Sequence, residues 1–349
     1  MSRPQNTTMR IAIVTDAWKP QVNGVVTTLS WTAKSLRDFG HEVKVFGPDR
    51  FRTFPLPSYP EIRLAWRPYK RLSEELRDFR PECIHIATEG LLGIAARRYC
   101  RRNKLVFTTS YHTQFPQYVR KRAPIPINTS YAFLRRFHLA AARTFVATQS
   151  QQDELEKHGF RNIVRWGRGV DTGTFKPGDK CFLYYPRPIW VYAGRIAVEK
   201  GLEDFLELSL PGTKLLVGDG PDRQSLENKW PDAVFTGYKF GSDLAAHMAA
   251  GDVFVFPSRT DTFGLVMIEA MACGLPVAAY PVTGPINVVE SGVTGILDDD
   301  LKRAAMLALE LDPQVCIDHA RQLSWPNATR QFEQNLVPVA GDLLPVQTG

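Results

Sequence analysis

Cysteine is scarce in this sequence and long apolar runs are absent, and both features exclude classes of protein. The 349 residues include five scattered cysteines and no Cys-x-x-Cys pair, so we expect neither a disulfide framework nor a zinc site. No segment has the ~20 apolar residues of a transmembrane helix, and no signal-peptide core follows the polar start. These absences predict a protein of the reducing cytoplasm.

Two common nucleotide-binding motifs are also missing. The chain contains no Gly-x-x-x-x-Gly-Lys-Ser/Thr loop, and no Gly-x-Gly-x-x-Gly follows the first apolar run at residues 9–15. Their glycines let the backbone approach phosphates in P-loop enzymes and in dinucleotide-binding proteins. Ordinary NTPases and nicotinamide dehydrogenases are therefore disfavoured.

Acidic residues are absent from 90–152, where eleven Lys or Arg occur. Residues 1–170 hold 29 Lys and Arg against 13 Asp and Glu, whereas 171–349 hold 14 against 23. Such asymmetry predicts an anionic partner for the first half. Nucleic acid would suit the positive charge, but the sequence contains no recognisable nucleic-acid-binding module, so we do not expect a nucleic-acid partner.

Strand and helix signals alternate along the chain in two series. A Pro- and Gly-rich stretch at 177–188 interrupts the alternation, which restarts with the apolar run at 189–193. Alternation of this kind predicts parallel sheets covered by helices on both faces. We expect an α/β protein of two doubly wound, Rossmann-like domains, at 9–176 and 186–325, facing a central cleft.

Glycine-containing turns follow two predicted strands of the second half. One is Gly218-Asp219-Gly220, and the other, at 194–201, carries Arg195 and Lys200. Backbone amides in such turns can approach an anion, and two cations nearby could clamp a diphosphate. The alternative is ordinary turn chemistry with solvated charges.

The stretch 260–277 places Asp261 in a turn and Glu269 inside an apolar helix. Carboxylates accept hydrogen bonds, as sugar hydroxyls require, and the turn amides of Phe263, Gly264 and Leu265 could hold sugar or phosphate oxygens. An unpartnered buried acid is costly, so Glu269 should have a ligand or an internal donor. A satisfied structural carboxylate is the alternative.

Taken jointly, these motifs resemble the donor domain of the retaining GT-B glycosyltransferases of family 4. The match extends to the first loop (Lys19 to Val25), to the junction (Gly169 to Phe175) and to 324–332, which is similar to the family's last helix. The resemblance implies that 326–349 return to the first domain. It also implies roles for individual residues.

At the donor site, the resemblance implies that Arg195 and Lys200 bind the diphosphate and that Glu269 holds the ribose hydroxyls. It implies that Asp261 and the three turn amides hold the transferred sugar, next to the glycine turn of Gly218 and Asp219. The family usually has glutamate where this chain has Asp261, one methylene shorter, which leaves the sugar contacts and donor preference open.

The resemblance further implies that the first loop closes over the phosphate at Gly24 and that His112 lies near the reacting sugar. Transfer would proceed with retention and without a metal or other cofactor, because cations and helix dipoles stabilise the leaving nucleoside diphosphate. We interpret His112 as a positioning group rather than a base; a core histidine is the alternative.

The segment 110–113 is similar to the lipid-glycosylating branch of the family, including sulfolipid synthases and diacylglycerol glycosyltransferases. Basic residues interleave with apolar ones at 97–102, at Arg120-Lys121-Arg122 and at 133–139, as in proteins that lie on anionic membranes. A solvated basic face is the alternative. We expect a peripheral enzyme of the inner leaflet that moves a hexose or uronic acid from UDP-glucose or UDP-glucuronate to diacylglycerol.

Three alternatives stay open. One is a GDP-mannose-dependent mannosyltransferase acting on a lipid or glycan. Another is a nucleotide-sugar-binding scaffold without transfer activity, which the substitution at Asp261 favours and the paired cations disfavour. The third is an epimerase of the same fold, which would need no acceptor.

Overall fold

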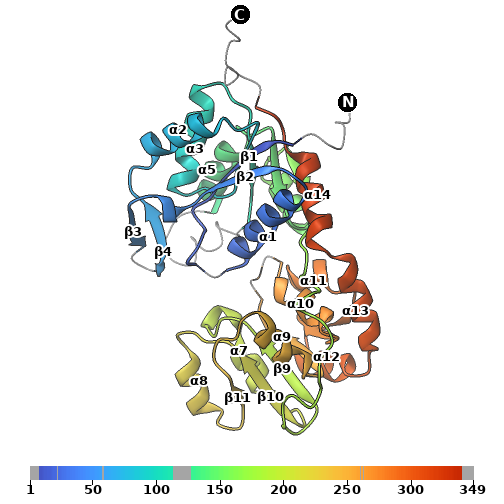
Figure 1. Ribbon diagram of the computed structural model, residues 1–349. Coiled ribbons are helices and arrows are strands. Elements are labelled where there is room, and N and C mark those ends of the chain that lie inside the picture. The colour runs from blue at the N-terminus through green and yellow to red at the C-terminus, as the bar shows by residue number, and fades with distance from the viewer. Residues whose placement is uncertain are drawn as a thin grey trace, which may run out of the picture. The chain divides into compact units, whose positions relative to one another are not determined.

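The computed structural model describes residues 8–21, 23–56, 59–112, 127–259, 261 and 263–339. The chain divides into two compact units (Figure 1). The first unit comprises 1–167 with 326–349, and the second comprises 168–325. Along the described part of the chain, no helix is both long and apolar enough to cross a bilayer.

A six-stranded parallel sheet forms the centre of the first unit, in the order β2-β1-β5-β6-β7-β8. The strand order reverses between β1 and β5, because β2 lies beside β1 on one side and β5 lies beside it on the other. Loops at the carboxyl ends of strands at such a point are where open α/β sheets bind ligands. The strands are β1 (Arg10–Val14), β2 (Glu42–Phe46), β5 (Cys83–Ile86), β6 (Thr108–Ser110), β7 (Arg143–Val146) and β8 (Ile163–Arg165). A separate antiparallel hairpin joins β3 (Thr53–Leu56) and β4 (Tyr59–Ala65).

Alternate residues of β1 contribute to cores on the two faces of this sheet, as the period of two requires. Ala12 and Val14 pack in the core that includes α2 (Tyr69–Phe79) and α3 (Leu91–Arg102). Ile11 and Ile13 pack in the core that includes α1 (Gly24–Asp38) and α14 (Trp325–Asn335), which lie beside each other in Figure 1. The other helices of this unit are α5 (Ile127–His138) and α6 (Gln149–Lys157), with the 3₁₀ turn η1 (Pro48–Arg50).

The C-terminal helix α14 belongs to the first unit although it follows the second in the chain. Phe332 is fully buried, with its ring 4.7 Å from that of Trp166 and 4.8 Å from that of His85. The Glu333 carboxylate lies 3.0 Å from Nε2 of His41. Aromatic packing therefore holds α14 on the first sheet.

Residues 168–175, which we assigned to the first domain, pack in the second unit. Val170 and Phe175 are part of its core, and the Val170 amide donates to the carbonyl of Leu323 at 2.8 Å. The chain thus passes between the units at Gly167, earlier than the Pro- and Gly-rich stretch that suggested a boundary.

The second unit has its own six-stranded parallel sheet, in the order β11-β10-β9-β12-β13-β14. The order reverses between β9 and β12, which is the arrangement of a Rossmann sheet. The strands are β9 (Ile189–Ala193), β10 (Thr213–Val217), β11 (Val234–Phe235), β12 (Val253–Phe256), β13 (Val277–Ala279) and β14 (Gly295–Leu297). The predicted fold class, two doubly wound α/β domains, is confirmed.

Helices cover both faces of this second sheet. Val191 and Phe254 face a core shared with α9 (Gly241–Ala249), α10 (Leu265–Ala272) and α13 (Pro313–Gln322). Trp190 and Val255 face a core shared with α7 (Leu202–Leu206), α8 (Arg223–Lys229) and α12 (Leu301–Ala308). The short elements η2 (Val198–Lys200) and α11 (Pro285–Val288) complete the unit.

One local prediction was wrong. The sequence after β7 predicts a helix over 150–158 with Ser150 as its N-cap, but α6 begins at Gln149 and its N-cap is Thr148, which accepts from the Gln151 amide at 3.2 Å. The hairpin of β3 and β4 was not predicted, because its prolines and short length obscure the alternation.

The packing of α14 predicts a large loss of stability on truncating its central ring. Phe332→Ala should lower the free energy of unfolding by about 3–5 kcal/mol, the usual cost of emptying a fully buried phenylalanine site. Urea denaturation followed by tryptophan fluorescence would measure it. The control is Phe133→Ala, because the Phe133 side chain is 50% exposed; equal losses in both variants would contradict the assignment.

Candidate functional site

Most predicted site residues lie at the carboxyl edge of the second sheet. The loop after β9 carries Arg195 and Lys200, the turn after β10 carries Gly218 and Asp219, and the segment after β12 leads through Asp261 to Glu269 on α10. These strands flank the point where the strand order reverses. The topology therefore gathers residues from three separate stretches at the edge where such sheets bind ligands.

The two glycine-containing loops pack backbone against backbone. A Cβ on Gly218 would lie 1.9 Å from the Gly194 carbonyl oxygen, and one on Gly220 would lie 2.1 Å from that of Ile196. The Ile196 amide donates to the Asp219 carbonyl at 2.9 Å. Only glycine fits at 218 and 220, so these glycines are explained by loop contact as well as by anion binding.

The side chain of Asp219 is engaged within its own turn. Its Oδ1 accepts from the Gly220 amide at 2.8 Å, and its Oδ2 accepts from Arg223 at 3.0 Å. These two hydrogen bonds lower the pKa of Asp219. The carboxylate thus stabilises the turn, while its predicted role in binding a ligand stays a prediction.

Lys200 and Asp261 form a close ion pair between the first and third loops. Nζ of Lys200 lies 2.8 Å from each carboxylate oxygen of Asp261, and the two side chains are 21% and 23% exposed. Burial raises the pKa of the neighbouring Tyr192, and the charge of Asp261 adds to the rise. The sequence predicted both residues as ligands of one donor but did not predict this pairing.

The turn before α10 is built around Gly264, whose φ of 81° is left-handed. This conformation starts α10 at Leu265 directly after Phe263 and Gly264. A second glycine supports the turn from another loop, since a Cβ on Gly284 would lie 2.8 Å from the Asp261 carbonyl oxygen. Gly284 was missed, although the Gly-Pro pair it begins, just after a predicted strand, signalled a tight turn.

Glu269 is a carboxylic acid on an otherwise apolar helix. No hydrogen bond or ion pair joins its carboxyl group to any residue that the structure describes. Burial raises its pKa from 4.5 to about 7. The expected internal donor is therefore absent from the described residues, which favours the hypothesis that a ligand hydroxyl binds there.

Ser258 is a second polar group without a protein partner in this region. It follows β12 by two residues and is fully buried, and none of the described residues hydrogen-bonds its Oγ. The Ser258 hydroxyl is thus enclosed by protein at this edge rather than open to a ligand.

Arg195, His112 and Gly24 are the remaining predicted site residues. Arg195 is exposed, and its carbonyl accepts from the Tyr192 hydroxyl at 2.9 Å. His112 and Gly24 lie in the first unit: His112 follows β6 with its ring 5.8 Å from that of Trp166, and Gly24 begins α1 behind the N-cap Asn23. Their proximity to the donor residues stays a prediction.

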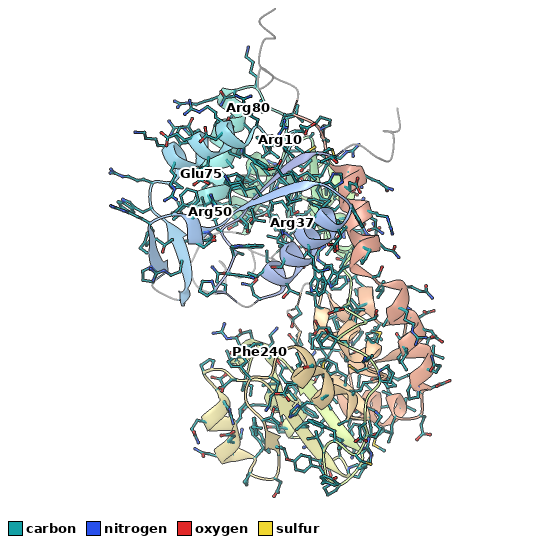
Figure 2. All side chains as sticks on the ribbon, in the orientation of Figure 1. Arg10, Arg37, Arg50, Glu75, Arg80 and Phe240 are labelled. Carbon is teal, nitrogen blue, oxygen red and sulfur yellow. The ribbon has the colours of Figure 1, made fainter. Side chains whose placement is uncertain are left out.

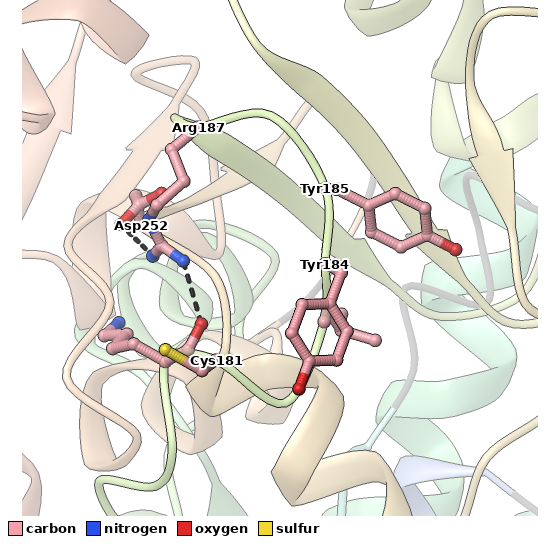
Figure 3. A pocket seen from close by; sticks show the side chains of 7 residues that line it. Cys181, Tyr184, Tyr185, Arg187 and Asp252 are labelled. Carbon is pink, nitrogen blue, oxygen red and sulfur yellow. Dashed lines mark hydrogen bonds and ion pairs between the residues drawn. The ribbon is translucent and has the colours of Figure 1, made fainter.

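A hollow of about 460 Å³ lies elsewhere on the second unit (Figure 3). Its lining includes Arg187 and Asp252, which precede β9 and β12 and so mark the amino edge of the sheet. These two side chains pair with each other, and Lys180 donates to the Gly251 carbonyl. With its charges engaged and at the opposite edge, this hollow is distinct from the candidate site. It is lined by Lys180, Cys181, Leu183, Tyr184, Tyr185, Arg187 and Asp252.

The described ranges contain no group of three or more His, Cys, Asp or Glu side chains arranged to hold a metal ion. Independence from metal stays an expectation.

Two family models match the chain, and between them they cover most of its length. Residues 22–174 match "Glycosyltransferase Family 4", and residues 187–311 match "Glycosyl transferases group 1". The first match lies mostly in the first unit, and the second covers the loops of the candidate site.

Curated relatives and solved structures agree with these matches. A GDP-mannose-dependent alpha-mannosyltransferase of Mycobacterium tuberculosis is 32% identical over 315 residues, 83% of each chain. An alpha-monoglucosyldiacylglycerol synthase of Streptococcus pneumoniae is 24% identical over 88% of this chain and 80% of its own. Sucrose-phosphate synthase of Thermosynechococcus elongatus has the same fold, with a TM-score of 0.74, 22% identity and coverage of 93% and 98%.

The environment of Glu269 predicts a specific pH dependence of stability. The pKa of Glu269 is about 7 in the folded state, above the usual 4.5, so the unfolded state releases the carboxyl proton more easily. The free energy of unfolding therefore falls as pH rises from 4.5 through 7. Glu269→Gln abolishes that loss. The variant should therefore match the wild type near pH 4.5 and exceed it at pH 8 by roughly 3 kcal/mol at most.

Urea denaturation at both pH values would measure this difference. Glu207→Gln, which alters an exposed glutamate of the same unit, is the control and should leave the pH dependence unchanged. Parallel curves for wild type and Glu269→Gln would contradict the burial argument.

Proposed function

Since the chain belongs to glycosyltransferase family 4, whose members are retaining hexosyltransferases of GT-B fold, we propose that it transfers a hexose from a nucleotide-sugar to a lipid acceptor at an anionic membrane surface. One observation carries the donor half of this proposal. Lys200, Asp261 and Glu269, whose carboxyl group has no partner among the described residues, stand at a single sheet edge. Together they offer a cation for phosphate and carboxylates for hydroxyls.

The ion pair suits the transfer chemistry. A lysine ammonium has three hydrogens to donate, and the contacts with Asp261 account for two oxygens at 2.8 Å. No other described residue accepts from Nζ, so a third hydrogen is left for a phosphate oxygen of the donor. The same cation can therefore position the carboxylate that binds the sugar and stabilise the leaving nucleoside diphosphate.

Glu269 supplies the second anchor in this proposal. Its carboxyl group accepts from the paired ribose hydroxyls, and Arg195 assists at the diphosphate. The acceptor hydroxyl attacks the anomeric carbon on the face from which the nucleoside diphosphate leaves, so that configuration is retained. The acceptor proton passes to the departing phosphate oxygen, and His112 positions the sugar.

The favoured donor is GDP-mannose. The Mycobacterium tuberculosis relative, 32% identical, is described as GDP-mannose-dependent, which supports this alternative over the UDP-glucose or UDP-glucuronate that we first expected. A second candidate, transfer from a UDP-sugar to diacylglycerol, is supported by the more distant alpha-monoglucosyldiacylglycerol synthase.

The lipid half of the proposal is supported by a basic surface on the first unit. We define it by the exposed cations of α3 and α5, Arg98, Arg101, Arg102, Arg135 and Arg136, with the exposed apolar residues Leu91, Ile94 and Phe133. Burial lowers the pKa of the adjacent Arg97, and the charges of Arg101 and Arg136 lower it further. Cations crowded in this way would be stabilised by an anionic partner.

Several cations elsewhere in the first unit pair with carboxylates. Glu75 on α2 accepts from Arg50 at 2.9 Å and from Arg71 at 3.1 Å; Figure 2 labels Glu75 and Arg50. Within the described ranges, none of the basic-surface arginines forms an ion pair with a carboxylate. Arg98 and Arg102 instead lie over the ring of Tyr69, at 4.7 and 5.6 Å. The segment Arg120-Lys121-Arg122 lies outside the described residues.

A single assay separates the candidate functions. The full-length protein is incubated with radiolabelled GDP-mannose, UDP-glucose or UDP-glucuronate, with and without diacylglycerol liposomes, and lipid is extracted. We expect label in the organic phase only with liposomes, and most of it from GDP-mannose. Lys200→Ala should lose this transfer while keeping its fold, and Lys302→Ala, at an exposed position, is its control.

Other outcomes would contradict the proposal in distinct ways. Organic label from UDP-glucose alone would favour the second donor, and label in a soluble glycan would remove the lipid acceptor. Isomerised donor without acceptor would indicate an epimerase. Donor binding with neither product would indicate a scaffold without transfer activity, and full activity in Lys200→Ala would show that the cation is misassigned.

The basic surface predicts binding to anionic vesicles. Reversing Arg101 and Arg136 to glutamate should weaken binding at least tenfold, because each cation near such a membrane contributes roughly 1 kcal/mol. Co-sedimentation with vesicles of anionic lipid would measure it, and the effect should shrink at high salt. Reversal of Lys157 and Lys302, which lie outside this surface, is the control; unchanged sedimentation of the arginine variant would refute the assignment.

A further inference from the structure

The first sheet presents a carboxylate at its own strand-order reversal, between β1 and β5. Glu89 follows β5 by three residues, and its side chain is 23% exposed. One carboxylate oxygen lies 3.0 Å from Nε2 of His138. Of the residues described, none forms a hydrogen bond with the other oxygen. From this placement we propose that Glu89 binds the acceptor's hydroxyl group, and that the acceptor is uncharged at that end.

A buried histidine fixes the orientation of Glu89. His138 is fully buried on α5, and its Nδ1 lies 2.9 Å from Oγ1 of Thr109. Thr109 Oγ1 lies 3.1 Å from that of Thr144, so the chain of hydrogen bonds extends to β7. His138 is thus a positioning residue, which holds one oxygen of Glu89 and leaves the other to accept from a ligand hydroxyl.

The nearby helix end is already neutralised by a second carboxylate. Asp16, which follows β1, accepts from the α3 amides of Leu92 at 2.8 Å and Gly93 at 3.2 Å, and from Oγ1 of Thr88 at 2.9 Å. A Cβ on Gly90 would lie 2.4 Å from the Asp16 carboxyl carbon, so glycine is required for this contact. The amides that would attract a phosphate are therefore occupied.

Two carboxylates at one place disfavour a third negative charge. Burial raises the pKa of Asp16 although its hydrogen bonds lower it, and the charge of Glu89 adds to the rise. A phosphate-bearing acceptor would be repelled, whereas a neutral hydroxyl would be a donor to Glu89. The inference rests on the proposed transfer reaction and narrows its acceptor to an uncharged polyol or alcohol, such as a diacylglycerol headgroup.

The test compares Glu89→Gln with the wild type, using the full chain. Acceptor KM and kcat are measured with diacylglycerol and with phosphatidic acid in the same vesicles, and the dissociation constant of the donor's nucleoside diphosphate is measured separately. We expect the wild type to prefer diacylglycerol. Glu89→Gln should raise the KM for diacylglycerol about tenfold and reduce the preference for diacylglycerol over phosphatidic acid. The dissociation constant of the nucleotide, which binds in the other unit, should stay within about twofold of the wild-type value.

Glu74→Gln, at an exposed glutamate of α2, is the control, and Glu89→Asp should recover part of the acceptor affinity. Unchanged acceptor kinetics in Glu89→Gln, an equal loss of nucleotide binding, or a wild-type preference for phosphatidic acid would each overturn the inference while transfer itself persists. If the wild type instead glycosylates a neutral soluble alcohol, the lipid proposal fails and Glu89 is tested with that acceptor. Failure to transfer to any acceptor overturns both.

Discussion

The ion pair of Lys200 and Asp261 is the contact on which the candidate donor site depends. It joins the loop after β9 to the segment after β12, across the point where the strand order of the second sheet reverses. Because both side chains are mostly buried, the ammonium is held by its carboxylate rather than moving freely in water. A diphosphate at this edge would meet a cation whose position is already fixed, so little reorganisation would be needed as negative charge develops on the leaving group.

Much of the fold could be predicted because it depends on local patterns. The apolar runs at 189–193 and 253–256 coincide with β9 and β12, since buried parallel strands are continuous apolar segments. Glu269 was identifiable for a similar reason, because a carboxylate on an apolar helix contrasts with its neighbours. The predicted N-cap of α6 was wrong because Thr148 and Ser150 are both suitable N-cap residues, and the local sequence does not distinguish them.

Contacts between distant residues could not be predicted in the same way. Lys200 and Asp261 are 61 residues apart, and only the folded sheet shows that their side chains meet. Gly218 illustrates the same limit, because its lack of a side chain is explained by the Gly194 carbonyl of another loop. Glu89 was visible as the last acid before the acid-free stretch, but its pairing with His138 depends on how α5 packs.

The charge asymmetry of the sequence corresponds to different groups of charged side chains in the two units. The acidic second half contains the carboxylates proposed for hydroxyl binding, with a few cations fixed among them. In the first half, arginines that have no acidic partner among the described residues gather on α3 and α5, whereas Asp16 and Glu89 stand at the sheet edge. Under the proposal, membrane attraction and acceptor recognition are thus separated on one unit: cations attract the surface, and carboxylates select a neutral hydroxyl.

A crystal structure of the protein with a bound, non-transferable nucleotide-sugar tests the central claim most directly. We predict a pyrophosphate within hydrogen-bonding distance of Nζ of Lys200, with the ribose hydroxyls on Glu269. A nucleotide bound at the Tyr184 hollow or elsewhere, with Glu269 still unpartnered, would contradict the account.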